Sequence, residues 1–290
     1  MKKVVMAAVI FFAIFANGWG GSAKASETET RATWLWNPWE IVNDESATLT
    51  FLEGKNVNKV YVQIDRDIPI TVYQSFIEKA SAKGLKIYAL DGGPNWAAPK
   101  GDQNLDQLMN WLKIYQNGSS ELQKFAGVHL DVEPYLYSGW STNQAATIKS
   151  YQALLLKANS SASDMGLSLE ADIPFWFDGV SYKNIYGKGT LAEWVIVNTN
   201  SITVMAYRDS ASLIMDLVKD EISLAGKYNK KLVIGVETGK TDEGSAISFF
   251  EEGEAYMNQE LAQVESFYAN TAGFGGIAVH HVDSWKVMKP

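Results

Sequence analysis

Short apolar segments alternate with longer amphipathic segments along most of the chain. The pattern predicts strands over residues 32–37, 57–65, 85–90, 127–134, 167–173, 202–207, 232–237 and 277–282. It predicts helices over residues 44–55, 71–83, 105–115, 143–160, 191–197, 211–228 and 244–268. Apolar strands that alternate with helices indicate a parallel sheet covered by helices.

Eight such strand–helix units, spread over about 250 residues, are typical of a (β/α)8 barrel. We therefore predict an α/β fold, a TIM barrel that forms a single domain. An open, doubly wound sheet is the alternative. The first predicted strand is not followed by the glycine-rich phosphate loop that many such sheets carry, which favours the barrel.

The N-terminus has the pattern of a secretory signal peptide. Lys2 and Lys3 precede an apolar run over residues 4–16, and Ala23-Lys24-Ala25 resembles a cleavage site. We predict a signal peptide over residues 1–25, a barrel domain over 26–290 and a secreted protein without membrane contact after cleavage. The chain contains no cysteine, which excludes disulfides and thiolate metal sites.

Charge and aromatic content narrow the range of partners. Without the three signal-peptide lysines, 22 basic residues face 33 acidic ones, a balance that disfavours nucleic acid. The 10 Trp and 13 Tyr suit stacking on sugar rings. We expect an oligosaccharide or polysaccharide partner, no cofactor and no metal. The helices lack a long heptad seam, so we expect a monomer.

The fourth predicted strand carries the most distinctive polar pattern. His129, Asp131 and Glu133 alternate with apolar residues, so their side chains share one face. Two carboxylates and an imidazole are costly to bury without a function. In a parallel barrel, ligands bind at the C-terminal ends of the strands, where these groups would lie.

The other predicted strands also end in carboxylates and aromatic residues. The pooled strand ends and their loops offer Trp36, Asp65, Asp91, Asp131, Glu133, Asp172, Trp176, Tyr207, Asp209, Glu237, His280, His281, Asp283 and Trp285. Glycoside hydrolysis uses paired carboxyl groups with different pKa values. We expect Asp65 and Asp91 to be structural, because strand-end aspartates often cap the next helix.

Residues 125–133 resemble the fourth-strand signature Asp-x-x-Asp-x-Asp-x-Glu of the chitinase-type hydrolases, glycoside hydrolase family 18. Three further segments resemble this family in the same order: Met205-Ala206-Tyr207, residues 231–235 and Gly275-Gly276-Ile277. The resemblance covers most of the chain after residue 25, but each motif is short.

The resemblance implies hydrolysis of an amino-sugar-containing polysaccharide or cell-wall glycan by a substrate-assisted mechanism. It places Glu133 as the general acid, Asp131 as the group that orients the 2-acetamido group, and Tyr207 as its hydrogen-bond partner. The expected substrate-binding residues are His129, Trp36, Asp172, Trp176, Glu237, His280 and Trp285.

The chain departs from the family pattern at several positions. Ala126 and His129 replace the first two aspartates of the signature, His280 replaces a tryptophan, and Arg208 replaces an aspartate. Adjacent carboxylates raise one pKa, whereas a protonated His129 would lower the pKa values of both Asp131 and Glu133. These departures leave a non-catalytic carbohydrate-binding barrel as the competing function.

Three other chemistries are alternatives to this mechanism. Glu133 and Glu237 could form the acid/base and nucleophile pair of a retaining glycosidase. A metal site could draw on His129, Asp131, His280, His281 and Asp283, although His280 and His281 should face opposite ways. A serine hydrolase is disfavoured because the sequence has no Gly-x-Ser-x-Gly motif.

Overall fold

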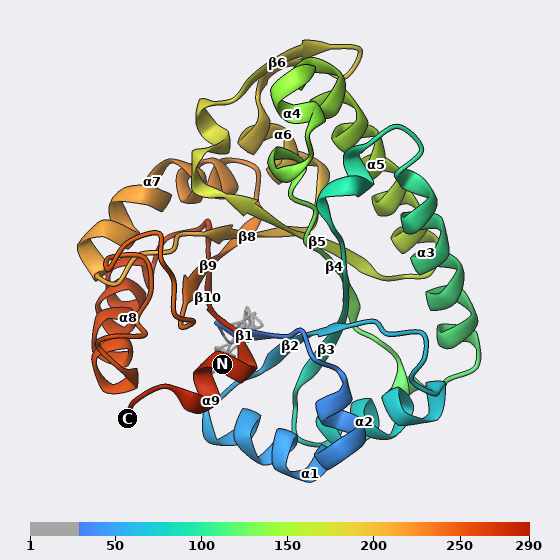
Figure 1. The fold of residues 1–290 in the computed structure, drawn as a ribbon, viewed down its shortest axis with the longest axis vertical. Helices are drawn as coiled ribbons and strands as arrows, with labels where there is room; N and C mark the ends of the chain where they lie inside the picture. Colours follow the sequence, from blue (N-terminus) through green and yellow to red (C-terminus); the bar gives the residue numbers. More distant parts are fainter. Residues whose placement is uncertain (1–28) are drawn as a thin grey trace, which may run out of the picture.

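Eight parallel strands close into a barrel in the computed structural model, which describes residues 29–290 (Figure 1). The order around the barrel is β1-β10-β9-β8-β5-β4-β3-β2. The strands are β1 (Thr30–Leu35), β2 (Lys59–Gln63), β3 (Lys86–Asp91), β4 (Gly127–Leu130), β5 (Ser168–Pro174), β8 (Ser201–Met205), β9 (Lys231–Glu237) and β10 (Phe274–His280). The predicted (β/α)8 fold is confirmed. The predicted signal peptide lies outside the described residues.

Helices cover the outside of the barrel (Figure 1). They are α1 (Trp39–Gly54), α2 (Ile70–Ala82), α3 (Asp102–Asn117), α4 (Gly139–Thr142), α5 (Gln144–Asp164), α6 (Leu191–Asn198), α7 (Ala211–Lys227), α8 (Glu254–Tyr268) and α9 (Val282–Val287). None of the helices within residues 29–290 combines the length and the apolar character needed to cross a bilayer.

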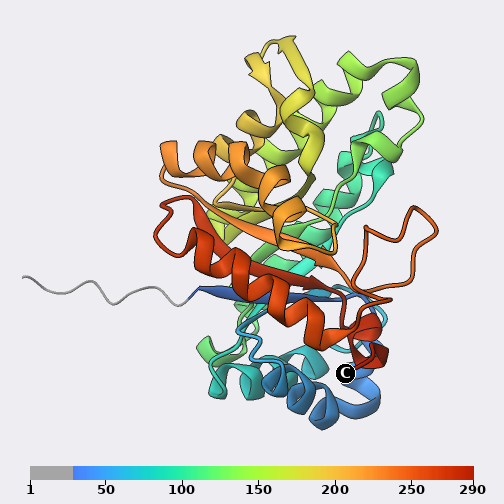
Figure 2. The ribbon, with the colours of Figure 1, turned by 90° about the vertical axis from the view of Figure 1, so that its left-hand side faces the viewer.

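Two segments differ from the sequence prediction. The hairpin of β6 (Ser181–Asn184) and β7 (Gly187–Thr190) was not predicted, because its short strands are largely exposed and lack an apolar face. The helix expected from residue 244 begins only at Glu254. Gly244 and Gly253 adopt positive φ angles of 142° and 94°, which a helix cannot contain. The intervening loop projects on the side toward which the barrel strands run (Figure 2).

The inside of the barrel is unusually polar, and the strand register places its polar groups. Strand β4 pairs with β5 so that His129 is opposite Glu170 and Leu130 is opposite Ala171. One residue further, Asp131 and Asp172 follow as neighbours on the inward face, because side chains alternate along a strand. The register thus brings carboxyl groups from two strands together at the C-terminal end of the barrel, called the mouth below.

Candidate active site at the barrel mouth

The backbone around Asp131 is held by the end of the neighbouring strand β3. The amide of Asp131 donates to the carbonyl of Asp91 at 3.1 Å. Gly92 approaches so closely that a Cβ atom there would lie 2.1 Å from the carbonyl oxygen of Asp131. Gly92 also has a φ of 155°, which disfavours other residues. These contacts fix where the chain leaves β4 and where Asp131 and Glu133 project.

Asp131 is a carboxyl group without a compensating donor. Among the described residues, none forms a hydrogen bond with its Oδ1 atom, which is buried. Burial raises the pKa of Asp131 well above its ordinary value, and the negative charges of Asp172 and Glu133 raise it further. The protonated form of Asp131 is therefore favoured.

Glu133 follows β4 at the mouth and is partly buried. Burial raises its pKa, although a hydrogen bond from the Tyr135 hydroxyl to Oε1 acts in the opposite direction. The ring of Tyr135 packs edge-on against Trp176, with centroids 5.0 Å apart. A glutamic acid that keeps its proton to higher pH and lies at a strand end can act as a general acid.

Tyr207 lies just beyond β8 and faces the carboxyl groups of the mouth. Its ring centroid is 5.8 Å from that of His280. Burial raises the pKa of the Tyr207 phenol well above its ordinary value, and the negative charges of Glu237, Asp172, Asp131 and Glu133 add to the shift. The phenol therefore stays neutral and available as a hydrogen-bond donor.

Glu237 and His280 form a bonded pair on the opposite side of the mouth from β4. His280 Nδ1 lies 2.7 Å from Glu237 Oε2, and the Trp36 indole donates to His280 Nε2 at 2.9 Å. An indole N–H can only donate, so Nε2 must accept, and the ring is neutral with its proton on Nδ1.

The carboxylate of Glu237 is also held by the backbone. Its Oε1 accepts from the amides of Thr238 at 2.8 Å and Gly239 at 2.6 Å. Burial alone would raise the pKa of Glu237, but the bond to His280 and these two amides outweigh it and lower the pKa. Glu237 is therefore a fully hydrogen-bonded carboxylate that orients His280.

His129 lies below the mouth, fully enclosed by the barrel. Its Nε2 is 2.9 Å from Asp172 Oδ1 and its Nδ1 is 3.7 Å from Glu170 Oε2. Burial by itself would lower the pKa of His129, but these two carboxylates raise it to about 9. His129 lowers the pKa of Asp131, as expected, but burial and the negative charges of Asp172 and Glu133 outweigh it, so the net shift is upward. The pKa of Glu133 is also raised, mainly by burial, so the expected net lowering of both pKa values is not found.

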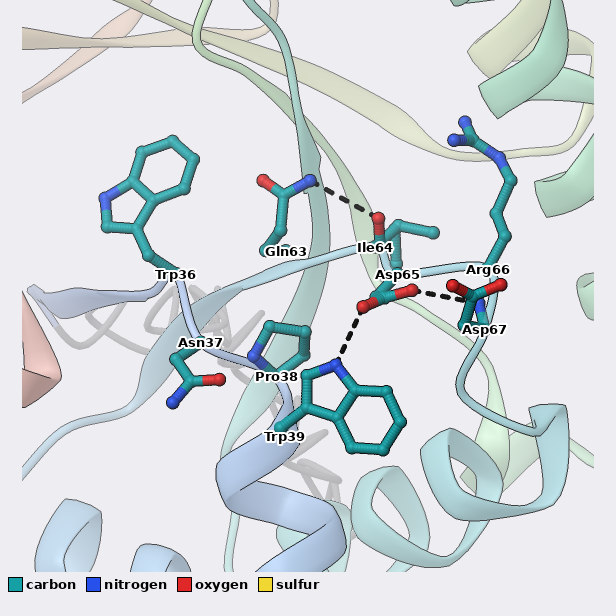
Figure 3. Close-up of a pocket in the computed structure, with 9 residues that line it drawn as sticks. All are labelled: Trp36, Asn37, Pro38, Trp39, Gln63, Ile64, Asp65, Arg66 and Asp67. Atoms are coloured by element: carbon teal, nitrogen blue, oxygen red, sulfur yellow. Dashed lines mark hydrogen bonds between the residues drawn. The ribbon is translucent and has the colours of Figure 1, made fainter.

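A cavity of about 510 Å³ adjoins the mouth at the ends of β1 and β2 (Figure 3). It is lined by Trp36, Asn37, Pro38, Trp39, Gln63, Ile64, Asp65, Arg66 and Asp67. The indole of Trp39 is 42% exposed and donates to Asp65 Oδ2 at 2.8 Å. Trp36 connects this cavity to the mouth through its bond to His280.

Asp65 and Asp91, which we expected to be structural, are both bound by protein donors. Asp65 accepts from Trp39 and from the amide of Asp67 at 2.9 Å. Asp91 accepts from the amide of Gly92 at 2.9 Å and pairs with Arg66 at 3.2 Å. These partners account for both carboxylates without a ligand.

The structure brings together nearly all the residues that were expected to be catalytic or substrate-binding. Those that meet in or directly below the mouth are Trp36, His129, Asp131, Glu133, Asp172, Tyr207, Glu237 and His280, with Trp176 one ring away behind Tyr135. Trp285 is not among them. It is 1% exposed, donates to Glu254 and packs against Phe51, so neither face of its ring is open to a sugar.

Two further expectations concern Ala126 and metal binding. Ala126 is exposed just before β4, at the end of the strand away from the mouth. Its departure from the family signature therefore does not alter the mouth directly. Within residues 29–290, no group of three or more His, Asp or Glu side chains has the arrangement of a metal site.

Several residues of the site were missed by sequence reasoning. They are Trp34, Lys59, Glu170, Tyr135 and Trp39. A signal existed for two of them. Lys59 interrupts the apolar second strand, and Glu170 stands two residues before Asp172, so the alternation of strand side chains places both on inward faces.

Comparisons with known proteins point to one fold. No protein-family model and no curated protein matches the sequence. A chitinase from Bacteroides thetaiotaomicron aligns with a TM-score of 0.57 at 12% identity, over 90% of this chain and 93% of that one. A GH18 chitinase from Pseudoalteromonas aurantia gives 0.56 at 12% identity, over 88% and 95%. A variant of the Cycas revoluta GH18 chitinase, in complex with (GlcNAc)4, gives 0.56 at 13% identity, over 88% and 95%. The resemblance to the chitinase-type barrels is confirmed at the level of the fold.

Proposed function

We propose that this protein is a secreted glycoside hydrolase that cleaves amino-sugar-containing polysaccharide or cell-wall glycan. The observation on which the proposal rests is Glu133, which lies partly buried just after β4 and whose pKa is raised by burial. A glutamic acid whose pKa is raised keeps its proton to higher pH and can protonate the oxygen of a glycosidic bond.

The proposed reaction proceeds in two steps with help from the substrate. Glu133 gives its proton to the glycosidic oxygen as the bond from that oxygen to the anomeric carbon breaks. The carbonyl oxygen of the sugar's own 2-acetamido group forms a new bond to the anomeric carbon, which gives an oxazolinium ion. Water then opens this ring, with the Glu133 carboxylate accepting the proton of the water.

Asp131 and Tyr207 are placed to handle the acetamido group. The neutral phenol of Tyr207 can donate to the acetamido carbonyl oxygen, and the carbonyl oxygen of the protonated Asp131 can accept from the acetamido N–H and orient the group. The partly exposed ring of Trp36 lines the cavity beside the mouth, and the partly exposed ring of Trp176 packs on Tyr135 next to Glu133. Both rings offer apolar faces to sugars. The Glu237 carboxylate is already bonded to the amides of Thr238 and Gly239 and to His280. These bonds favour the substrate-assisted mechanism over one in which Glu237 is the nucleophile.

The proposal is tested by product release from a panel of N-acetylated and partly deacetylated glycan oligomers. The Glu133→Gln variant should lose about 10²- to 10⁴-fold in kcat, because it removes the general acid while keeping the side-chain size. Glu221→Gln is the matched control. Glu221 is buried on α7, its pKa is raised to about 7, and it lies outside the barrel interior.

Two outcomes would contradict the proposal. Equal cleavage by the wild type and Glu133→Gln would remove Glu133 from the mechanism. Tight oligomer binding by both proteins, measured by calorimetry, with no product from any oligomer, would leave a carbohydrate-binding barrel in place of an enzyme. Secretion is tested separately by N-terminal sequencing of the protein recovered from the medium, where we expect Ser26 as the first residue.

A further inference from the structure

Four charged side chains form a chain inside the barrel directly below the mouth, and the reaction proposed above does not use them. Lys59 Nζ is 2.7 Å from Glu170 Oε1, and His129 lies between Glu170 and Asp172. The side chains of His129, Asp172 and Glu170 are 0%, 2% and 5% exposed. Barrel interiors are normally filled by branched apolar residues, and buried ion pairs cost more desolvation than they return unless well bonded. The presence of four buried charged side chains in this barrel interior therefore indicates a specific role.

The charges in this chain balance each other. Lys59 and a protonated His129 supply two positive charges, and Glu170 and Asp172 supply two negative charges. Asp172 is also held at its second oxygen, because the Trp34 indole donates to Oδ2 at 3.0 Å. With a cation on one oxygen and an N–H on the other, Asp172 is stabilised as an anion.

Asp131 is the next carboxyl group along the register, and no cation remains for it. Leu130 of β4 is paired with Ala171 of β5. Asp131 and Asp172 are the next residues on the two strands, so their carboxyl groups are neighbours on the inward face. Asp131 Oδ1 is buried and, within the described residues, has no hydrogen-bond partner. Asp172 Oδ1 also lacks hydrogen-bond geometry, but the His129 ring lies 2.9 Å from it as an ion-pair partner, and Asp131 has no such ion pair among the described residues. Two neighbouring buried carboxyl groups cannot both be ionised without a large cost, so one of them takes the proton.

We propose that the Lys59–Glu170–His129–Asp172 chain decides which carboxyl carries that proton. His129 stays an imidazolium, Asp172 stays an anion, and Asp131 is the group that is protonated next to Glu133. His129 and Asp172 are positioning residues, since they act on the reaction through Asp131 and Glu133. The charge assignment stands independently, and only its catalytic consequence rests on the proposed function.

The surroundings of His129 support this assignment. Tyr61 stacks on the imidazole with centroids 3.7 Å apart, and burial raises the pKa of its phenol, so it adds no charge. Several titratable groups face this chain from the elements packed around it. The tyrosines are Tyr61 of β2, Tyr88 of β3, Tyr151 of α5 and Tyr207 after β8. The remaining groups are Asp131 and Glu133 after β4, Glu237 of β9 and His280 of β10, in addition to Lys59, Glu170 and Asp172 of the chain itself. His280 bonds to Glu237 through Nδ1 and accepts from Trp36 at Nε2, so it is paired with Glu237 and not with this chain. Lys59 and His129 are therefore the cations that face Glu170 and Asp172.

Nuclear magnetic resonance tests the charge assignment without a substrate. Labelled imidazole nitrogens should show His129 protonated at both positions at neutral pH and losing a proton near its pKa of about 9. The labelled carboxyl carbon of Asp131 should titrate above the ordinary aspartate range. In Asp172→Asn the titration of Asp131 should move down by about one pH unit, because a neighbouring negative charge is lost. Glu221→Gln should leave both signals unchanged.

Two results would overturn the assignment. One is a His129 ring that is singly protonated at neutral pH. The other is an Asp131 titration that Asp172→Asn does not move. If Asp172→Asn does not fold, Glu170→Gln replaces it, since it removes the other carboxylate from His129. That variant should move the deprotonation of His129 to lower pH, and an unmoved titration would overturn the assignment equally.

Activity gives a second, separate readout. The negative charge of Asp172 raises the pKa of Glu133, so Asp172→Asn should shift the alkaline limb of the kcat/KM profile to lower pH by about one unit. KM should change little. If Asp172 were only structural, Asp172→Asn would lower kcat/KM at all pH values without shifting the alkaline limb of the profile. If the wild type cleaves no glycan, the proposed function fails, while the resonance titrations still decide the charge assignment.

Discussion

Two histidines face the inside of the same barrel, and their surroundings give them different charges. His129 has a carboxylate near each ring nitrogen, Asp172 at 2.9 Å and Glu170 at 3.7 Å, and is fully buried. His280 has a carboxylate on one side only, Glu237 at 2.7 Å, and accepts the indole N–H of Trp36 on the other. The first is an imidazolium and the second is neutral.

The difference shows that the partner of the second ring nitrogen decides the charge of a buried histidine. A carboxylate there favours a second proton by its charge, whereas a donor such as Trp36 disfavours it. It also separates two tasks in the barrel. The buried ion chain around His129 is fixed by packing on all sides, while the His280 side chain is 21% exposed and borders the space where a ligand would enter.

The largest expected effect comes from removing the imidazolium. We expect His129→Leu to lower the free energy of unfolding by about 3–5 kcal/mol, because two buried carboxylates lose their shared cation. His280→Gln should cost about 1 kcal/mol, as expected for a lost hydrogen bond near the surface. Urea unfolding at neutral pH measures both. Equal costs for the two substitutions would mean that the contrast between the histidines has no energetic basis.

The pH dependence of stability sharpens the same contrast. The pKa of His129 is raised from 6.5 to about 9 in the folded state. Its contribution to stability is therefore fully present below about pH 6.5 and is lost as the pH rises through about 9. The shift corresponds to about 3 kcal/mol. We expect wild-type stability to fall over this range and His129→Leu to lack this fall. Parallel stability curves for the two proteins would contradict the assignment.

The smallest expected effect tests the donor that keeps His280 neutral. Trp36→Phe removes the indole N–H and should cost about 1 kcal/mol in unfolding experiments. Trp39→Phe is the matched control, because it removes an indole N–H from the more exposed bond to Asp65 and should cost less. A cost for Trp36→Phe as large as that of His129→Leu would show that the mouth is held as rigidly as the interior.

The sequence determined the fold class and the strand that carries the proposed acid. Eight apolar segments in alternation with helices specify a parallel barrel, because each strand has to bury both faces. The alternation of His129 and Asp131 indicates a shared face, because side-chain direction along a strand is a local property of the backbone. The strand predicted over residues 127–134 ends at Leu130, so Glu133 is placed by the segment that follows β4 and not by strand alternation. The acetamido-handling role of Tyr207 remains a prediction that follows from the family resemblance.

The tertiary structure decided which of these groups touch and what charge they carry. That His129 meets Asp172 and Glu170 depends on the register between β4 and β5, and the neutral state of His280 depends on an indole 244 positions away in the chain. Trp285 does not line the mouth, because it lies on α9, which begins at Val282, and its ring packs against Phe51. A pKa is set by burial and by charges across strands. Those distances exist only once the barrel has closed.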